Sequence, residues 1–216
     1  MDTLFNNIVP LLHGARVTLE LFFITVILAM PLGLALALMR ISRFRLLTAG
    51  VNAYIWLMRG TPLMLQMFFI YFALPNIPGF PIILPDFLTA VIAFTLNYAA
   101  YLSEVFRAGI QSIDKGQYEG AKVLGYTYLQ TMRHIVMPQV IKRVLPPLSN
   151  ETITLVKDTS LIYVLALSDL LKVVRGIVLR DFSPAPFVVA AVFYLLMTFL
   201  LTWVFQRMEK HYAVYD

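Results

Sequence analysis

Long apolar runs alternate with short polar connections along this chain. Five runs are each about 20 residues long, the length that a helix needs to cross a hydrocarbon core about 30 Å thick. They lie near residues 17–39, 53–74, 87–107, 145–166 and 186–206. The fourth run is interrupted by Lys157 and Asp158. The pattern predicts an all-α polytopic membrane protein with five transmembrane helices, which form a single domain over residues 1–216.

The composition agrees with a chain that resides in lipid. Of 216 residues, 60% are apolar and 13% are charged, and the mean hydropathy is +0.78, which is far from the values of a soluble domain. The chain has no cysteine, which excludes disulfides, thiolate metal sites and thiol catalysis. In such a protein a net charge of +5 indicates orientation and contact with anionic membrane lipid, and no nucleic-acid partner is expected.

Basic residues gather on one side of a five-span arrangement. That side carries Arg40, Arg43, Arg45, Lys115, Lys122, Arg133, Lys142, Arg143, Arg207 and Lys210, and the other side carries Arg16, Lys172, Arg175 and Arg180. Because cytoplasmic loops are enriched in Lys and Arg, the first side is expected to be cytoplasmic. The N-terminus is then outside and the C-terminus is cytoplasmic. An inverted topology is favoured only if the fourth run does not span.

A polar, amphipathic segment separates the third and fourth runs. Between Gln111 and Arg143, apolar residues recur at helical spacing, and Gly116, Gly125 and Pro138 punctuate them. This predicts short helices joined at Gly125, where a glycine permits a tight turn and a close backbone approach. On amphipathicity alone, an interfacial helix resting on lipid is favoured over an element that docks into a soluble subunit.

The order of residues in this segment reverses that preference. Glu119-Gly120-Ala121 is followed after three residues by Gly125, and after nine more by Ile135, Met137 and Pro138. This resembles the cytoplasmic coupling signature of ABC-importer membrane subunits, which reads Glu-Ala-Ala, three residues, Gly, nine residues, Ile-x-Leu-Pro. Gly120 and Met137 are the two departures.

Three further motifs resemble the polar amino-acid branch of these permeases. They are Arg59-Gly60-Thr61-Pro62 at the opening of the second run, Ala99-Ala100-Tyr101-Leu102-Ser103-Glu104 with Arg107 and Gly109 in the third, and Lys157-Asp158-Thr159-Ser160-Leu161 in the fourth. Each is weak alone. Four motifs in the right order on a chain of this length form a specific signal.

The resemblance implies a membrane permease subunit of an ABC importer of the histidine, arginine, glutamine or glutamate type, in the bacterial inner (plasma) membrane. It implies a coupling helix within about residues 117–138, with contacts from Glu119, Gly120, Ala121, Gly125, Ile135 and Pro138. It also implies two ATP-binding cassette subunits that bind ATP and Mg, a second permease copy or a homologous permease, and an extracellular or periplasmic substrate-binding protein. No cofactor is expected in this chain.

Two carboxylates in the fourth run are candidates for the translocation path. Glu151 and Asp158 are seven residues apart, so on a helix they share one face about 10 Å apart along the axis, flanked by Asn150 and Thr154. Charges inside a membrane are costly and face protein or water. We expect this face to line the path and to meet the ammonium group or a cationic side chain of an amino acid. Alternatively, Lys157 neutralises Asp158 and Glu151 lies near the headgroups.

The third run carries a polar seam. Glu104 and Arg107 are three residues apart and are expected to form an intrahelical ion pair. Asn97 and Tyr101, four residues apart, are further candidates for substrate contact. Outside the membrane, the segment from Asp169 to Arg180 has the pattern of an amphipathic interfacial helix.

Motifs for catalysis are missing from the sequence. The stretch from Gly116 to Lys122 has neither the spacing nor the Ser/Thr of a phosphate-binding loop. His13, His134 and His211 are scattered, so no metal site or catalytic residue is expected. The chain is therefore predicted not to be an enzyme. It is predicted to be the subunit that carries a polar amino acid, including a cationic one, across the membrane by alternating access. The alternative is an ion-coupled secondary transporter or channel that acts without an ATPase.

Overall fold

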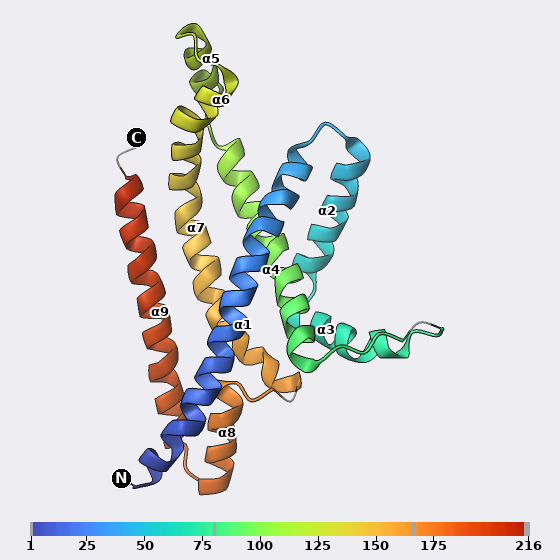
Figure 1. Ribbon diagram of the computed structural model, residues 1–216, viewed down its shortest axis with the longest axis vertical. Coiled ribbons are helices and arrows are strands. Elements are labelled where there is room, and N and C mark those ends of the chain that lie inside the picture. Colours follow the sequence, from blue (N-terminus) through green and yellow to red (C-terminus); the bar gives the residue numbers. More distant parts are fainter. Residues whose placement is uncertain (1, 80, 166, 214–216) are drawn as a thin grey trace.

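Long helices running roughly side by side make up most of the molecule (Figure 1). The structure, a computed structural model, describes residues 2–79, 81–165 and 167–213. The four longest helices are α1 (Asp2–Ile41), α4 (Asp86–Gln111), α7 (Met137–Asp158) and α9 (Ala185–Tyr212). The shorter elements are α2 (Arg45–Gly60), α3 (Leu63–Phe68), η1 (Phe69–Ala73), η2 (Leu74–Asn76), α5 (Lys115–Val123), α6 (Tyr128–Thr131), η3 (Met132–Val136), η4 (Thr159–Leu165) and α8 (Leu170–Asp181). The described residues contain no strand, and the all-α prediction is confirmed.

Three of the predicted spans are single helices in the structure. By length and composition, the helices Asn7–Ile41, Asp86–Gln111 and Ala185–Tyr212 can each cross a membrane. They contain the predicted runs 17–39, 87–107 and 186–206 and extend beyond them. The count rises to four within the described residues if one sharply bent pair of helices forms a span. The predicted count of five is therefore not confirmed.

The bent pair corrects the prediction of one continuous helix over residues 53–74. The chain forms α2 up to Gly60 and then turns by 106° into Leu63–Asn76. Pro62 is the cause, because it has no N–H for a helix and disfavours a helical conformation at the residue before it. Thr61 is accordingly extended, with φ −122° and ψ 146°. The Arg59-Gly60-Thr61-Pro62 motif thus lies at the end of α2 and at the break. In Figure 1 the α3 arm projects sideways from the bundle.

The fourth predicted span, near residues 145–166, is not a single α-helix in the structure. The helix α7 begins at Met137, ends at Asp158 and continues as a 3-10 helix over Thr159–Leu165. Residue 166, where the predicted span ends, lies outside the described residues. α7 is not among the helices that qualify as spans, because Lys142, Arg143, Glu151, Lys157 and Asp158 make it polar.

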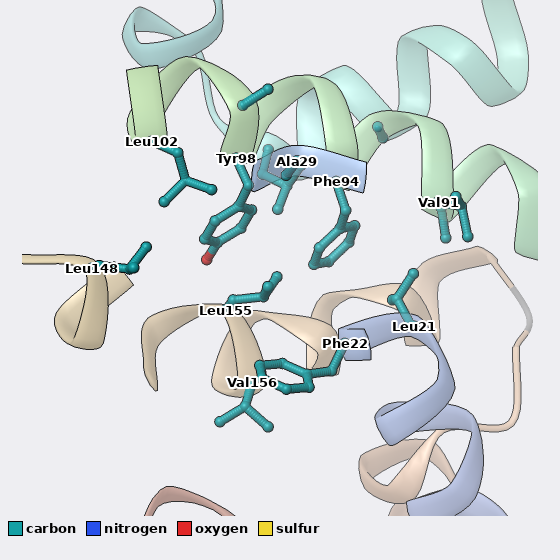
Figure 2. Packing of buried hydrophobic residues seen from close by; sticks show 14 of the residues in the cluster. Leu21, Phe22, Ala29, Val91, Phe94, Tyr98, Leu102, Leu148, Leu155 and Val156 are labelled. Atoms are coloured by element: carbon teal, nitrogen blue, oxygen red, sulfur yellow. The ribbon is translucent and has the colours of Figure 1, made fainter. Parts of the chain in front are cut away.

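The core lies where α1, α4 and α7 meet. Phe94 and Leu21 are fully buried, and Figure 2 shows Phe94 and Tyr98 of α4 packed between α1 and α7. The approach of α1 to α4 is close at Gly33, where a Cβ atom would lie 2.9 Å from the Cβ of Leu102 and 3.1 Å from the carbonyl oxygen of Ala99. A small residue at such a contact lets two membrane helices pack backbone to backbone.

The segment between α4 and α7 forms two short helices with a well-defined joint, as predicted. Gly125 has φ +80° and ends α5 in a Schellman motif, in which Tyr126 donates to Ala121 (3.0 Å) and Gly125 donates to Lys122 (3.1 Å). Thr127 then starts α6 with a capping box that includes Gln130. From Tyr128 the chain stays helical through a π-helical turn over Met132–Val136 and on through α7.

The predicted outer amphipathic helix is α8, and Asp169 begins it. The Asp169 carboxylate is fully buried and accepts hydrogen bonds from the backbone N–H groups of Leu171 (3.0 Å) and Lys172 (3.2 Å). Thr18 of α1 accepts a further bond from the N–H of Leu170 at 3.3 Å. The N-terminus of α8 is thereby fixed against α1. Burial raises the pKa of the Asp169 carboxyl to about 6.

Substitutions at Gly125 and Gly120 should have opposite effects. Gly125→Ala places an L side chain at φ +80° and should destabilise the joint by about 1–2 kcal/mol. Gly120→Ala is the matched control, because its Cβ meets no atom within 4 Å and alanine favours the helix by about 1 kcal/mol. Hydrogen exchange over residues 115–131 should become faster in the first variant and slower in the second. Equal protection in both variants would contradict the assigned joint.

The stability of the protein should depend on pH through Asp169. The pKa is about 6 in the folded protein against the usual value of 3.8, so the folded state binds the proton more tightly and loses stability as the pH rises through about 6. Asp169→Asn keeps an acceptor for the helix N-terminus and removes this dependence. The free energy of unfolding of the wild type minus that of the variant should therefore fall by up to about 3 kcal/mol between about pH 4 and about pH 7. Equilibrium unfolding in mixed detergent micelles measures this difference at each pH. A difference that does not change with pH would contradict the raised pKa of Asp169.

Candidate functional site

Apolar side chains are exposed at the end of the molecule formed by α5 and α6. We call Val123, Leu124, Tyr126, Tyr128 and Leu129 the coupling tip. Val123 is 87% exposed and Leu124 is 75% exposed, and in Figure 1 these helices project beyond the ends of α1, α2 and α9. Apolar residues gathered on an exposed surface mark interaction sites.

The predicted coupling residues lie on and beside this tip. Glu119, Gly120 and Gly125 are exposed, whereas Ala121 is buried. Ile135 lies in the π-helical turn and Pro138 in the first turn of α7. The segment is held to α7 by Gln139, which donates to the side chain of Gln117 at 3.0 Å. The tip is thus presented on an anchored segment.

A polar stripe follows one face of α7. Asn150, Thr154 and Lys157 are exposed, and at 100° per residue they lie within about 60° of one another around the helix axis. Glu151 and Asp158 are half-buried and lie at the edge of the stripe. The structure therefore brings four of the predicted substrate-binding residues together, namely Asn150, Glu151, Thr154 and Asp158. In a membrane protein such a stripe has to face water or another protein surface.

Asp158 is held by a tyrosine of α4. The Tyr98 hydroxyl donates to Oδ2 of Asp158 at 2.7 Å, and Figure 2 shows this hydroxyl pointing from α4 toward α7. The sequence hypothesis named Lys157 as the partner of Asp158, and Tyr98 is the hydrogen-bond partner that the structure gives. A hydrogen bond to an ionised group is among the stronger ones, so it fixes the position of this carboxylate.

Glu104 is surrounded by three arginines. The predicted ion pair with Arg107 is present at 2.7 Å and is confirmed. Arg40 at the end of α1 also contacts the Glu104 carboxylate, and Arg59 at the end of α2 approaches it at 3.4 Å. Three cations around one anion leave an excess of positive charge. Of the three guanidinium groups, that of Arg59 is the most exposed, at 42%.

Arg59 connects this cluster to the carboxylates of α7. Its guanidinium carbon lies 5.3 Å from the centroid of the Tyr101 ring, within the range of a cation–π contact. Arg59 is also close enough to Glu151 for the two charges to interact. Tyr101, a predicted substrate-binding residue, thus contacts an arginine of this cluster.

Asn97 belongs to the helix break. The residue is 4% exposed, and its amide nitrogen donates to the carbonyl of Met58 and to the side chain of Gln66, both at 3.0 Å. Gln66 in turn donates to the Met58 and Thr61 carbonyls, at 2.9 and 3.1 Å. These amides satisfy the backbone groups that the break leaves without helical partners. The amide nitrogen of Asn97 is therefore engaged at the helix break.

Sequence reasoning missed the roles of Arg40, Gln66 and Arg59. Gln66 carried a readable signal, because an amide four residues after a proline in an apolar run can satisfy a broken helix end. Arg40 and Arg59 carried none, since the contact with Glu104 joins three different helices. Within the described part of the chain, no three His, Cys, Asp or Glu side chains gather as a metal site requires.

Comparisons with known proteins agree with this geometry. The arginine transport system permease protein ArtQ of Bacillus subtilis is 37% identical over 202 residues, covering 93% of this chain and 91% of the relative. The probable glutamine ABC transporter permease protein GlnM of the same organism is 39% identical over 219 residues, covering 98% and 99%. A solved amino acid ABC transporter, crystallised with histidines, superimposes with a TM-score of 0.84 at 33% identity, covering 94% of both chains. Residues 29–214 match the family described as binding-protein-dependent transport system inner membrane component, and this chain belongs to that family.

Proposed function

We propose that this chain forms the translocation path for a polar amino acid in an ATP-driven importer. The observation that carries the proposal is the coupling tip, an exposed apolar surface on an anchored segment of a chain without a phosphate-binding loop. Such a surface fits a groove on a soluble ATPase subunit. The similar chains are named as arginine and glutamine permeases, which supports an amino acid as cargo.

The partners follow from this arrangement. Two ATP-binding cassette subunits bind ATP and Mg and contact one coupling tip each, and a second permease, either a copy or a homologue, faces the polar stripe of α7. An external substrate-binding protein delivers the amino acid. The localisation that fits these partners is the bacterial inner membrane, with the tip on the cytoplasmic side, as the basic residues indicate.

The polar stripe and its surroundings suit a zwitterion. Glu151 and Asp158 offer negative charge to an ammonium group or a cationic side chain, with Asn150 and Thr154 as neutral hydrogen-bonding neighbours. Arg59, whose contact with Glu104 is the longest of the three at 3.4 Å, offers a guanidinium to the substrate carboxylate. Tyr101 holds that guanidinium near Glu151. Asn97 is left out of the proposed site, because its amide is engaged in the helix break.

ATP drives this path by favouring one of two states. When ATP closes the soluble subunits, the tips move together and the paired permeases open outward. After hydrolysis they return to the inward-open state. A shift of the population from 1:99 to 99:1 requires about 5.5 kcal/mol of differential binding.

Reconstitution tests the proposal directly. The chain in vesicles with candidate ATPase and substrate-binding subunits should accumulate labelled arginine or glutamine only when ATP is present on the side of the ATPase. Omitting any one subunit should abolish uptake, because the chain alone has no phosphate-binding loop. Uptake by the chain alone, driven by an ion gradient, would establish the alternative of a secondary transporter or channel.

Charge-removing substitutions test the polar stripe. Glu151→Gln and Asp158→Asn should each reduce ATP-driven uptake of a cationic amino acid about tenfold or more, the range of a lost hydrogen bond between charged groups. Glu209→Gln, near the end of α9, is the matched control and should leave uptake unchanged. If cationic and neutral substrates fall together, and the thermal midpoint falls too, the carboxylates are structural.

A further inference from the structure

An apolar groove lies between four helices on the coupling-tip side of the molecule. Its volume is about 790 Å³, within the range of about 300–1,000 Å³ that ligand sites occupy. The walls include Leu34 and Leu38 of α1, Ile110 of α4, Leu145 of α7, Met132 of η3 and Met208 of α9. In Figure 1, α9 stands at the outer side of α7, so this groove is at the edge of the bundle.

The chemistry of the walls selects an apolar ligand. Among the described residues that line the groove, those with polar side chains are Ser42, Tyr118, Tyr128 and Tyr212. None of these four side chains carries a charge at neutral pH. Leu38 is 56% exposed, so the wall is open to a ligand at that point. A hydrocarbon chain gains free energy by filling such a space, at about 0.8 kcal/mol for each buried methylene.

The groove opens toward lipid and away from the polar stripe. At 100° per residue, Ile141 and Leu148 in the groove wall lie roughly 160–180° around α7 from Asn150. A second permease that faces the stripe therefore approaches α7 from the opposite side. The neighbouring helix α9 exposes apolar side chains along its length, among them Val188, Leu195 and Phe199, as lipid-facing helices do.

A basic residue directly follows one of the groove residues in the chain. Ser42 lines the groove, and Arg43, the next residue, is exposed. Its end of the molecule is the one that the basic residues assign to the cytoplasm, where the leaflet carries anionic lipids. Arg43 thus complements the phosphate of a lipid whose chain lies along α1.

We propose that the groove binds one anionic phospholipid of the cytoplasmic leaflet. An acyl chain lies between α1, α4, α7 and α9, and the phosphate pairs with Arg43. The chain contacts Met132 and Tyr118 at the base of the coupling segment. The lipid therefore fills a space that the described residues leave open and supports the segment from the membrane side.

Native mass spectrometry of the permease with its co-purifying subunits tests this site. After extraction in mild detergent and addition of phosphatidylglycerol, the wild type should retain one phospholipid per permease chain. Leu38→Trp fills the groove and should reduce occupancy at least fivefold, and the smaller filling variant Leu34→Phe should reduce it in the same direction. Leu195→Trp is the matched control, because Leu195 is exposed on α9 outside the groove, and it should retain the lipid.

A second variant separates the headgroup from the chain. Arg43→Gln should keep a bound phospholipid and lower the preference for phosphatidylglycerol over phosphatidylcholine about fivefold. Arg175→Gln, on α8 at the other end of the molecule, should leave that preference unchanged.

Three results would overturn the proposal. They are detergent as the only bound molecule, equal retention in Leu38→Trp and Leu195→Trp, and a disulfide-linked permease pair formed by Leu38→Cys. A disulfide in the Leu38→Cys variant can only involve the introduced cysteine, because the chain has no cysteine of its own. It would show that a second copy occupies the groove. Lipid is counted on the resting complex, so these results do not depend on the proposed transport.

Discussion

The need to pair one carboxylate within the bundle joins three helices of this structure. Removing the Glu104 carboxylate from water costs free energy. Ion pairs with Arg40, Arg59 and Arg107 offset that cost. Because those arginines come from the ends of α1 and α2 and from α4 itself, the pairing brings three helices together at one level. Arg59 lies at the C-terminal end of α2, just before the break at Thr61 and Pro62. Pro62 causes that break, and the amide contacts of Gln66 and Asn97 and the sideways direction of α3 follow from it.

The helix break shows that, within a membrane, backbone groups without helical partners need partners from the protein itself. Where α2 stops, the carbonyls of Met58 and Thr61 lose their helical partners, and hydrocarbon offers no water to replace them. Gln66 and Asn97 replace those partners with side-chain amides. The apolar pattern over residues 53–74 has no means of indicating this, since hydropathy is the same for a straight helix and a bent one. Pro62 was the available signal.

Prediction succeeded where the information is local. The runs that became α1, α4 and α9 are long and uncharged enough to be recognised by length alone, and Gly125 was assigned its turn because only a glycine adopts φ +80° without strain. The i,i+3 pair of Glu104 and Arg107 is likewise set by helical geometry. Prediction failed where a partner comes from another helix, as for Tyr98 with Asp158 and Arg40 with Glu104. For the fourth run, 145–166, the apolar pattern predicted a helix, but it did not show that α7 begins at Met137 and ends at Asp158.

The uninterrupted helical path from Tyr128 to Asp158 has a mechanical consequence. Thirty residue steps at 1.5 Å each make a rod roughly 45 Å long, with the coupling tip at one end and the Tyr98-bound carboxylate at the other. A rod of hydrogen-bonded turns transmits torque, so a small rotation imposed at Tyr128 turns the whole polar stripe through a similar angle. Substrate access would then be governed by an angle of twist. That twist would be set where the helical hydrogen bonding is interrupted, at the π-helical turn over Met132–Val136 and at Pro146 and Pro147 within α7.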